Sequence, residues 1–458
     1  MGESFLSLSG PRLRGRAGLT PDRLDRPVTD PLFSHLFPSL ATGVPWGLER
    51  VNSALDELGN PHHGYPTLHV GGTNGKGSVA ATLAAILSAG HLRTGLYTSP
   101  HLCSFRERFQ ISGRPVEEAC LVVAADEIRD VIVRHGLTSF EAATVLGLHL
   151  FAREQVAVAV LEVGLGGRLD ATNVVSPEVA VVTNVAVDHA EFLGDTRDLI
   201  AVEKAGIAKE GVPFVTAETD PGVLEVFGAI CAERGTPLHV LAPGDLRDVE
   251  VVTDHTTFTM VTRGWGELRI TTPLVGSHQA VNAALAVKVL EHATVQLRPS
   301  ARAVVDGVAG VSWSGRDQIE EISGRTWILD VAHNSAGVGS LVDVLDRIDL
   351  PRPWVALIGV LGDRDWRNML PPVLQRVDRA ILTRPSSAPP ERCWDITEAA
   401  EVFGALLSAG YPLTTELDFN DAFDGVQAGP PGGTVVVTGS CHTVGDALKR
   451  LDRCPFPV

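Results

Sequence analysis

The stretch that decides the fold is HVGGTNGKGS at residues 69–78. It follows a short apolar run and leads into residues 78–87, where Val79, Leu83 and Leu87 recur at helical spacing. A strand, a glycine-rich turn and a helix in this order are typical of phosphate binding, because glycines let backbone N–H groups approach the oxygens and the helix N-terminus adds a favourable dipole. Residues 69–78 are therefore predicted to form a phosphate loop.

The loop departs from the common Walker A pattern at one position. That pattern places Ser or Thr directly after the lysine, whereas here Gly77 lies between Lys76 and Ser78. Lys76 is still expected to reach the outer phosphates, and Ser78 can supply an oxygen ligand to Mg²⁺. A glycine-rich turn without a ligand is the alternative, and the flanking strand and helix argue against it.

The composition is that of a globular protein with two or three domains. The chain has 458 residues, of which 44% are hydrophobic and 20% charged. Its 38 basic and 55 acidic side chains give a net charge of −17, which disfavours nucleic acid and anionic membranes as partners. The sequence has no basic stripe with interleaved aromatic residues to offset that charge. We therefore expect neither nucleic acid nor a membrane among the partners.

Six cysteines are scattered along the chain without a C-x-x-C pair. This distribution favours reduced thiols over a disulfide framework or a zinc site. Apolar runs fall short of the roughly 18 residues that a membrane span needs, and the N-terminus lacks the apolar core of a signal peptide. The sequence thus predicts a cytoplasmic protein.

Four segments differ in composition and pattern. Residues 1–28, rich in Arg, Pro, Gly and Ser, are expected to be a mobile extension. Residues 29–311 hold the phosphate loop and a small β-rich insert, and residues 312–316 are expected to be a linker. Strands and helices alternate again over residues 317–458. The predicted fold class is α/β, with a doubly wound P-loop-type ATPase domain followed by a Rossmann-like domain.

Two nearly continuous apolar runs, at residues 156–163 and 179–187, predict strands covered on both faces of a parallel sheet. Glu162 lies near the end of the first run, and Asp188 and His189 follow the second. Open α/β sheets bind ligands at that edge. Each of these residues alone is more simply a buried structural group, but beside a phosphate loop they favour a metal–nucleotide site.

A series of motifs resembles the Mur ligase superfamily, and within it the folylpolyglutamate synthase/dihydrofolate synthase family. The resemblance runs from about residue 48 to 448. Its motifs lie at residues 72–78, 98–101, 162–173, 188–189, 203–207, 314–316, 330–334 and 439–445. The glycine before Ser78 is itself a family feature. Ser314 and Ser335 stand where the family usually has Pro, and neither change removes a reacting group.

The resemblance implies an ATP-dependent acid–amino-acid ligase of folate biosynthesis and polyglutamylation. In such enzymes ATP phosphorylates a substrate carboxylate, and the amine of L-glutamate attacks the acyl phosphate to form an amide. Phosphorylation is needed because a free carboxylate is a poor electrophile. The acceptor would be dihydropteroate or a reduced folate. Closure of the second domain onto the first would exclude water from the acyl phosphate.

The resemblance also implies roles for individual residues. Lys76, Lys204 and His189 are expected to act in catalysis, with Lys204 carbamylated. Two Mg²⁺ ions are expected, and their ligands would be Ser78, Ser99, Glu162, His189 and Lys204. Contacts to ATP are expected from Thr73, Asn74, Gly75, Lys76, Gly77, Ser78, Asn282, Arg316, Asp330 and His333. The pterin is expected between Thr138, Ser139, Phe140 and Glu141 on one side and Leu169, Asp170 and Ala171 on the other.

Three alternatives stay open from the sequence. A Mur-type ligase could act on a different carboxylate acceptor, although Gly77 and the segment 169–170 argue against it. A P-loop binding protein without ligase chemistry would leave the second α/β domain unexplained. The chain could also carry only the folylpolyglutamate synthase activity. We expect a monomer.

Overall fold

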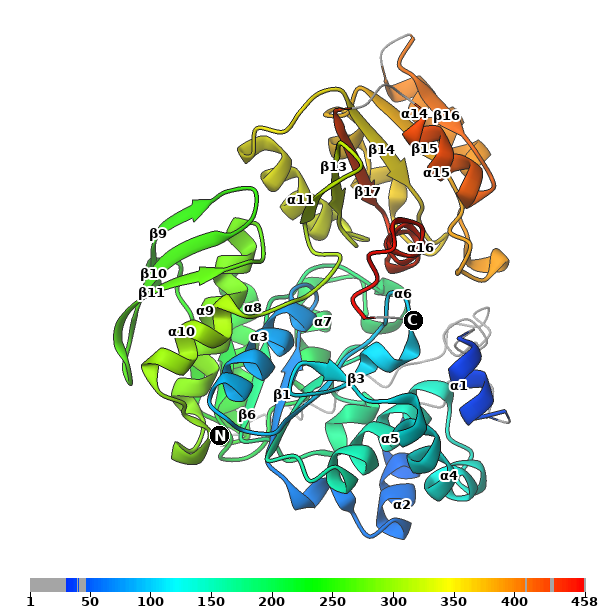
Figure 1. The fold of residues 1–458 in the computed structure, drawn as a ribbon. Coiled ribbons are helices and arrows are strands. Elements are labelled where there is room, and N and C mark those ends of the chain that lie inside the picture. Colours follow the sequence, from blue (N-terminus) through cyan, green and yellow to red (C-terminus); the bar gives the residue numbers. More distant parts are fainter. Residues whose placement is uncertain (1–29, 39, 41–46, 408–409, 429–431, 457–458) are drawn as a thin grey trace, which may run out of the picture.

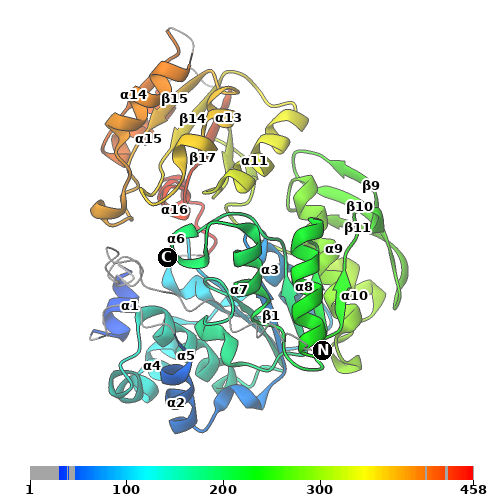
Figure 2. The ribbon, with the colours of Figure 1, turned by 180° about the vertical axis from the view of Figure 1, so that it is seen from behind.

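The structure is a computed structural model that describes residues 30–38, 40, 47–407, 410–428 and 432–456. The expected mobile extension at residues 1–28 lies outside the described residues. Two α/β lobes lie one above the other in Figure 1, and Figure 2 shows them from behind. Among the described residues, no helix is both long and apolar enough to cross a membrane.

The larger, N-terminal lobe is built on an eight-stranded sheet. Its strand β1 (Thr67–Gly71) lies between β5 (Val158–Glu162) and β6 (Val179–Val182), and both pairings are parallel. The other strands are β2 (Thr94–Tyr97), β3 (Phe109–Ile111), β4 (Arg114–Pro115), β7 (Phe214–Thr216) and β8 (Leu238–Val240). The strand order is β4-β3-β2-β5-β1-β6-β7-β8. Side chains of β1, β5 and β6 are buried along their whole length, as expected for central strands covered on both faces.

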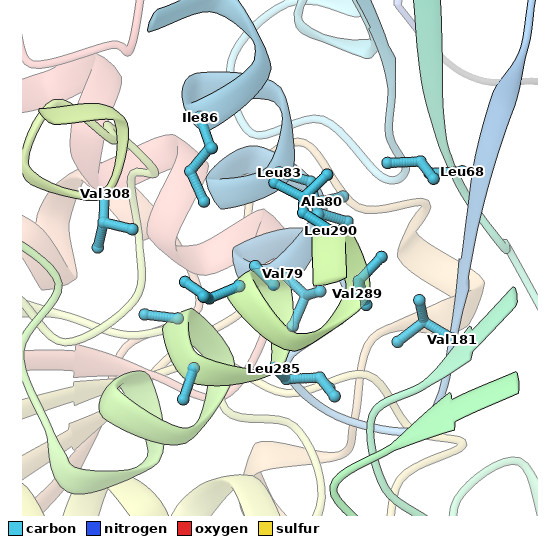
Figure 3. Packing of buried hydrophobic residues seen from close by; sticks show 14 of the residues in the cluster. Leu68, Val79, Ala80, Leu83, Ile86, Val181, Leu285, Val289, Leu290 and Val308 are labelled. Carbon is cyan, nitrogen blue, oxygen red and sulfur yellow. The ribbon is translucent and has the colours of Figure 1, made fainter. Parts of the chain in front are cut away.

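Helix α3 (Lys76–Ala89) leads from the phosphate loop into the core of this lobe. It is enclosed by the sheet and by α9 (Ser277–His292) and α10 (Ala301–Ala309), and Figure 3 shows the apolar side chains between them. Gly307 permits a close approach of α10, because a Cβ there would lie 2.4 Å from the Cα of Ile86. A helix that is apolar on all sides has to be buried. The core therefore fixes the position of the phosphate loop.

The remaining helices of the lobe cover the sheet and its rim. They are α1 (Pro31–Leu36), α2 (Glu49–Glu57), α4 (Glu118–Arg134), α5 (Ser139–Arg153), α6 (Ala190–Leu193), α7 (Arg197–Ala205) and α8 (Pro221–Glu233). A three-stranded antiparallel sheet packs beside α9 and α10. Its strands are β9 (Leu246–Val251), β10 (Thr256–Thr262) and β11 (Gly266–Thr272). This small sheet is the β-rich insert predicted from the sequence.

The smaller lobe contains a six-stranded sheet in the order β12-β13-β17-β14-β15-β16. Only the edge strand β12 pairs antiparallel among the described strands of this sheet. The strands are β12 (Gln318–Ile322), β13 (Arg325–Leu329), β14 (Trp354–Ile358), β15 (Arg379–Leu382), β16 (Leu413–Thr415) and β17 (Thr434–Thr438). The helices are α11 (Ser335–Arg347), α12 (Trp366–Met369), α13 (Pro371–Leu374), α14 (Ile396–Leu406), α15 (Phe419–Gln427) and α16 (Cys441–Leu451). The second α/β domain predicted from the sequence is therefore confirmed as a fold.

Cys103 and Cys454 form a disulfide between the lobes, so the expectation that all six thiols are reduced was wrong for this pair. Cys103 lies in the loop after β2, and Cys454 follows α16, 351 residues later, with a Cα–Cα distance of 6.0 Å. At the same junction Gly445 packs on Leu102, since a Cβ at position 445 would lie 2.2 Å from the carbonyl oxygen of Leu102. The disulfide therefore reinforces a contact that is already tight.

Replacing Cys454 with Ser should lower the free energy of unfolding by about 2–4 kcal/mol, the usual value of one disulfide. Calorimetry without reductant would show this as a lower melting temperature, and a dithiol reductant should shift the wild type equally. Cys120→Ser is the matched control, because Cys120 is a free thiol. A melting temperature of the wild type that does not respond to reductant would contradict the bond.

Candidate active site

The phosphate loop is held by side chains from the end of β6. Gly75 precedes α3 with φ of 82°, a conformation that favours glycine. The carbonyl of Asn74 accepts hydrogen bonds from Thr183 Oγ1 at 2.6 Å and from Asn184 Nδ2 at 3.1 Å. The apolar run at 179–187 stops being a strand at this point, because its polar side chains bind the loop. The loop and the N-terminus of α3 are thereby aligned for an anion.

Gly77, the residue that departs from the Walker A pattern, lies against the indole ring of Trp313. A Cβ at position 77 would lie 2.8 Å from Cζ2 and Nε1 of that ring. Trp313 belongs to the segment 312–316 that joins the lobes, so the connection between the lobes covers the first turn of α3. The contact leaves no space for a larger side chain at this position. Contact with Trp313 therefore explains why glycine follows Lys76 in this loop.

Oxygen donors suited to Mg²⁺ gather beside the loop. Ser78 Oγ is buried and has no hydrogen-bond partner within the described residues. Glu162 accepts a hydrogen bond from the backbone N–H of Ser99 at 3.1 Å, and burial raises the pKa of its carboxyl group. The described residues contain no group of three or more His, Cys, Asp and Glu that could hold a metal. Mg²⁺ commonly takes one or two carboxylates together with substrate phosphates and water, so this donor set fits it.

Lys204 projects from α7 into the base of the phosphate loop. Its Nζ donates a hydrogen bond to the carbonyl of Gly72 at 2.8 Å, and its side chain is almost fully buried. Burial, assisted by the charge of Lys76, lowers the pKa of Lys204 to about 7. His189 lies just before α6, and burial lowers its pKa to about 4, with the Arg364 guanidinium acting in the same direction. Both pKa shifts disfavour the charged forms of these side chains.

The smaller lobe contributes Asp330 and the residues that follow it. The carboxylate of Asp330 accepts a hydrogen bond from the backbone N–H of Asp317 at 2.9 Å, and burial together with the Asp317 charge raises its pKa well above the usual range. His333 Nε2 lies 3.5 Å from a carboxylate oxygen of Asp188, and Asn334 Nδ2 donates to the same oxygen at 3.0 Å. The two lobes therefore meet directly at the candidate site.

One cavity of about 360 Å³ collects these groups at the junction of the lobes. All residues expected to contact ATP or Mg²⁺ line it, namely Thr73, Asn74, Gly75, Lys76, Gly77, Ser78, Ser99, Glu162, His189, Lys204, Asn282, Arg316, Asp330 and His333. The structure brings these residues together, while their individual roles as ligands stay predictions.

A second cavity of about 1090 Å³ adjoins the first. The two share wall residues, which are Pro100, Arg392, Cys441 and His442. Arginine and lysine outnumber carboxylates in the wall of the larger cavity. The basic residues are Arg106, Arg108, Arg392 and Lys449, and the acidic residues are Asp30 and Glu118. A ligand with several carboxylates would suit this space.

The first expected pterin segment is divided between the larger cavity and the core. Ser139 and Phe140 line that cavity. Thr138 and Glu141 instead form the capping box of α5, and Glu141 also accepts two hydrogen bonds of 2.7 Å from Arg50. Ser139 and Phe140 are therefore placed where they could contact a pterin. Thr138 and Glu141 instead have a structural role in capping α5.

The second expected pterin segment, residues 169–171, is not found in the wall of either cavity. Asp170 is buried and accepts hydrogen bonds from the backbone N–H of Leu165 at 2.8 Å and of Thr172 at 3.0 Å. These bonds shape the turn after β5. The contribution of residues 169–171 to pterin binding stays a prediction.

Sequence reasoning did not assign two residues that the structure places at the site, Arg364 and Asn334. Arg364 Nη1 donates to Asp188 Oδ1 at 2.5 Å. Burial alone would raise the pKa of Asp188, but the hydrogen bond from His333 and the charges of His189 and Arg364 hold it well below its usual range. A signal for Arg364 existed, because its GDRD motif at residues 362–365 follows the apolar run at residues 354–358, and open sheets bind ligands at the ends of such strands.

Two family models match the chain, the Mur ligase middle domain over residues 70–290 and the Mur ligase, glutamate ligase domain over residues 315–441. The folylpolyglutamate synthase of Lacticaseibacillus casei is 33% identical over 447 residues, covering 92% of this chain and 97% of that protein. The dihydrofolate synthase/folylpolyglutamate synthase of Escherichia coli (strain K12) is 34% identical over 415 residues, covering 89% and 92%. The chain belongs to this family of Mur ligases.

Solved structures of such ligases have the same fold. The Mycobacterium tuberculosis folylpolyglutamate synthase complexed with ADP and AMPPCP gives a TM-score of 0.82 at 32% identity, covering 90% of this chain and 96% of that one. E. coli FolC in complex with DHPP and ADP gives 0.80 at 31% identity, covering 93% and 99%. Both of these relatives were thus solved with an adenine nucleotide bound.

In this Mur ligase, Gly77→Ser should weaken ADP binding, because the new side chain collides with Trp313. Overpacking of this kind costs about 1–3 kcal/mol, which corresponds to roughly a 5- to 150-fold rise in Kd by isothermal titration calorimetry. The double variant Gly77→Ser/Trp313→Ala should recover much of the affinity. Equal affinities of Gly77→Ser and the wild type would show that the contact does not constrain the loop.

Proposed function

We propose that the protein joins L-glutamate to the carboxylate of dihydropteroate or a reduced folate in an ATP-dependent reaction through an acyl phosphate. The observation that carries the proposal is the meeting of two cavities at the lobe junction. One is built around a phosphate loop, and the other is large and has a predominantly basic wall. The relatives named above are folylpolyglutamate and dihydrofolate synthases, which supports this choice of donor and acceptor.

The phosphate loop would bind ATP with its γ-phosphate toward the larger cavity. Lys76, whose Nζ now donates to the carbonyl of Thr73 at 3.0 Å, would exchange that bond for phosphate oxygens. Ser78, Ser99, Glu162, His189 and Lys204 would hold two Mg²⁺ ions between them. The ions, when bound, would offset phosphate charge. Asn282, Arg316 and Asp330 would position the nucleoside from helix α9, the linker and the smaller lobe.

The acceptor would lie in the larger cavity with its pterin near Phe140 and its carboxylates toward the basic residues. The carboxylate that is phosphorylated must reach the shared wall, where Pro100 and His442 separate the two cavities. Attack by the glutamate amine on the acyl carbon then releases phosphate and forms the amide. Closure of the lobes protects the acyl phosphate from water. Because both reactants are already held in place, their reaction becomes effectively unimolecular.

Lys204 is proposed to be carbamylated. A lysine adds CO₂ through its neutral amine, and burial gives this lysine a pKa of about 7. The product is an anion, so the positive charges of Lys76 and of bound Mg²⁺ would stabilise it. Arginine could not replace Lys204 in this role because it does not lose its proton.

Carbamylation of Lys204 should increase as the pH rises through about 7, because the neutral amine becomes the major form there. Carbon-13 NMR with labelled bicarbonate would show a carbamate signal in the wild type. Lys204→Ala should abolish that signal, whereas Lys209→Ala, a variant of a nearby lysine, should keep it. A wild-type protein without a carbamate signal at pH 8 would contradict the modification.

The proposed reaction is tested by mass spectrometry of products formed from ATP, Mg²⁺ and glutamate with either dihydropteroate or tetrahydrofolate. Addition of glutamate to both acceptors would establish a bifunctional enzyme, and addition to one would assign the branch. Lys76→Ala should lower the rate of ADP formation at least about 100-fold, since it removes a donor from the transferring phosphoryl group. Undiminished ligation by this variant would refute the mechanism.

Two other functions make distinct predictions in the same assay. A Mur-type ligase with another acceptor would form ADP only when that acceptor is supplied. A nucleotide-binding protein without ligase chemistry would bind ATP and form no amide. A monomeric state and a cytoplasmic location stay predictions, which gel filtration and cell fractionation would check.

A further inference from the structure

Asp188 of the larger lobe is contacted by several side chains of the smaller lobe beside the nucleotide cavity. Its carboxylate belongs to the larger lobe and is nearly buried, with a side-chain exposure of 10%. Three side chains of the smaller lobe converge on it. They are His333 at 3.5 Å, Asn334 at 3.0 Å and Arg364 at 2.5 Å.

Two of the three side chains also reach a second residue of the larger lobe. Asn334 exchanges hydrogen bonds with Asn74, and His189 is reached by Arg364. Arg364 Nη1 donates to Asp188, and Nη1 and Nη2 each lie 3.4 Å from His189 Nε2. The guanidinium is 12% exposed. Its Nε lies 3.8 Å from the carboxylate of Asp363 and has no hydrogen-bond partner within the described residues. The planar fork therefore spans a carboxylate and an imidazole, which a lysine ammonium could not reproduce.

The loop that carries Arg364 moves with the smaller lobe. Residues 359–365 follow β14, which pairs with β17 and β15 inside the six-stranded sheet. Asp188 and His189 follow β6 of the other sheet. Both contacts of Arg364 therefore exist only while the lobes are closed.

We propose that Arg364 is a positioning residue that couples closure of the lobes to the orientation of His189. When the lobes rotate apart about the junction held by the Cys103–Cys454 disulfide, Arg364 leaves Asp188, and the half-buried His189 side chain is free to turn. When they close, the guanidinium fixes Asp188 and places the His189 ring at the edge of the cavity. The consequence for catalysis rests on the proposed function, whereas the coupling itself is a property of the two lobes.

A purely stabilising ion pair is the competing explanation. A buried ion pair contributes little net stability relative to apolar residues, because desolvation offsets the attraction, but removing one partner alone leaves the other charge uncompensated. The smaller lobe also offers a contrasting pair, Arg367 with Glu398, which is half-exposed and lies entirely within that lobe. If Arg364 served stability alone, its removal would lower the stability of the whole protein and would not act mainly on the contact between the lobes.

The kinetic test compares Arg364→Ala and Arg364→Lys with the matched control Arg367→Ala. Both Arg364 variants should lower kcat about 100-fold, the usual effect of a small misplacement in an active site. The KM for ATP should change much less, because the proposal has Arg364 act through His189 rather than through direct contact with the nucleotide. Free guanidinium ion should partly restore Arg364→Ala and leave Arg364→Lys unchanged. Arg367→Ala should stay within about twofold of the wild type.

Hydrogen–deuterium exchange without substrates gives a readout that does not depend on the reaction. Arg364→Ala should speed exchange at residues 72–78 and 330–337, on the two sides of the junction, while exchange in the rest of both lobes stays unchanged. Unchanged exchange and kcat in Arg364→Ala would overturn the proposal, and so would faster exchange throughout both lobes with a lower melting temperature. A wild type that forms no amide would refute the proposed function instead, and the exchange data would still decide the coupling.

Discussion

The burial of helix α3 is the constraint on which the site depends. This helix is apolar on every side, so it is stable only between the sheet and helices α9 and α10. Its first residue, Lys76, immediately follows the loop that faces the nucleotide cavity. A core that cannot shift thus supports a loop that must present its backbone N–H groups at fixed positions. The close packing around α3 therefore keeps the backbone N–H groups of the phosphate loop in a fixed geometry.

The ionisable groups around this loop are held away from their ordinary charge states. Burial lowers the pKa of Lys204 and raises that of Glu162 and Asp330. All three shifts favour neutral forms in the protein alone. The cations that accompany an incoming nucleotide would restore the ionised forms of the two carboxyl groups. Binding and protonation at this site are therefore coupled, and ligand arrival changes the electrostatics of the whole junction.

Local sequence signals predicted the strands and the nucleotide cavity well, because both depend on short-range pattern. The strands Trp354–Ile358 and Thr434–Thr438 lie in the region where strands and helices were predicted to alternate, and each is a short apolar run. The run after Val179 was only partly a strand, because its later side chains bind the phosphate loop. The Cys103–Cys454 disulfide and the contact of Arg364 with Asp188 join segments far apart in sequence. Their pairing is a product of lobe packing, which spacing does not encode.

The contact between Trp313 and Gly77 has a practical consequence. Indole emission responds to the polarity and mobility of its surroundings, and this ring lies against the first turn of the nucleotide-binding helix. It also belongs to the segment 312–316 that joins the two lobes along the chain. Trp313 is thus an intrinsic fluorophore at a position that both nucleotide binding and movement of the lobes would affect. Emission from Trp313 is therefore expected to change when nucleotide binds, which makes this ring an intrinsic probe of the site.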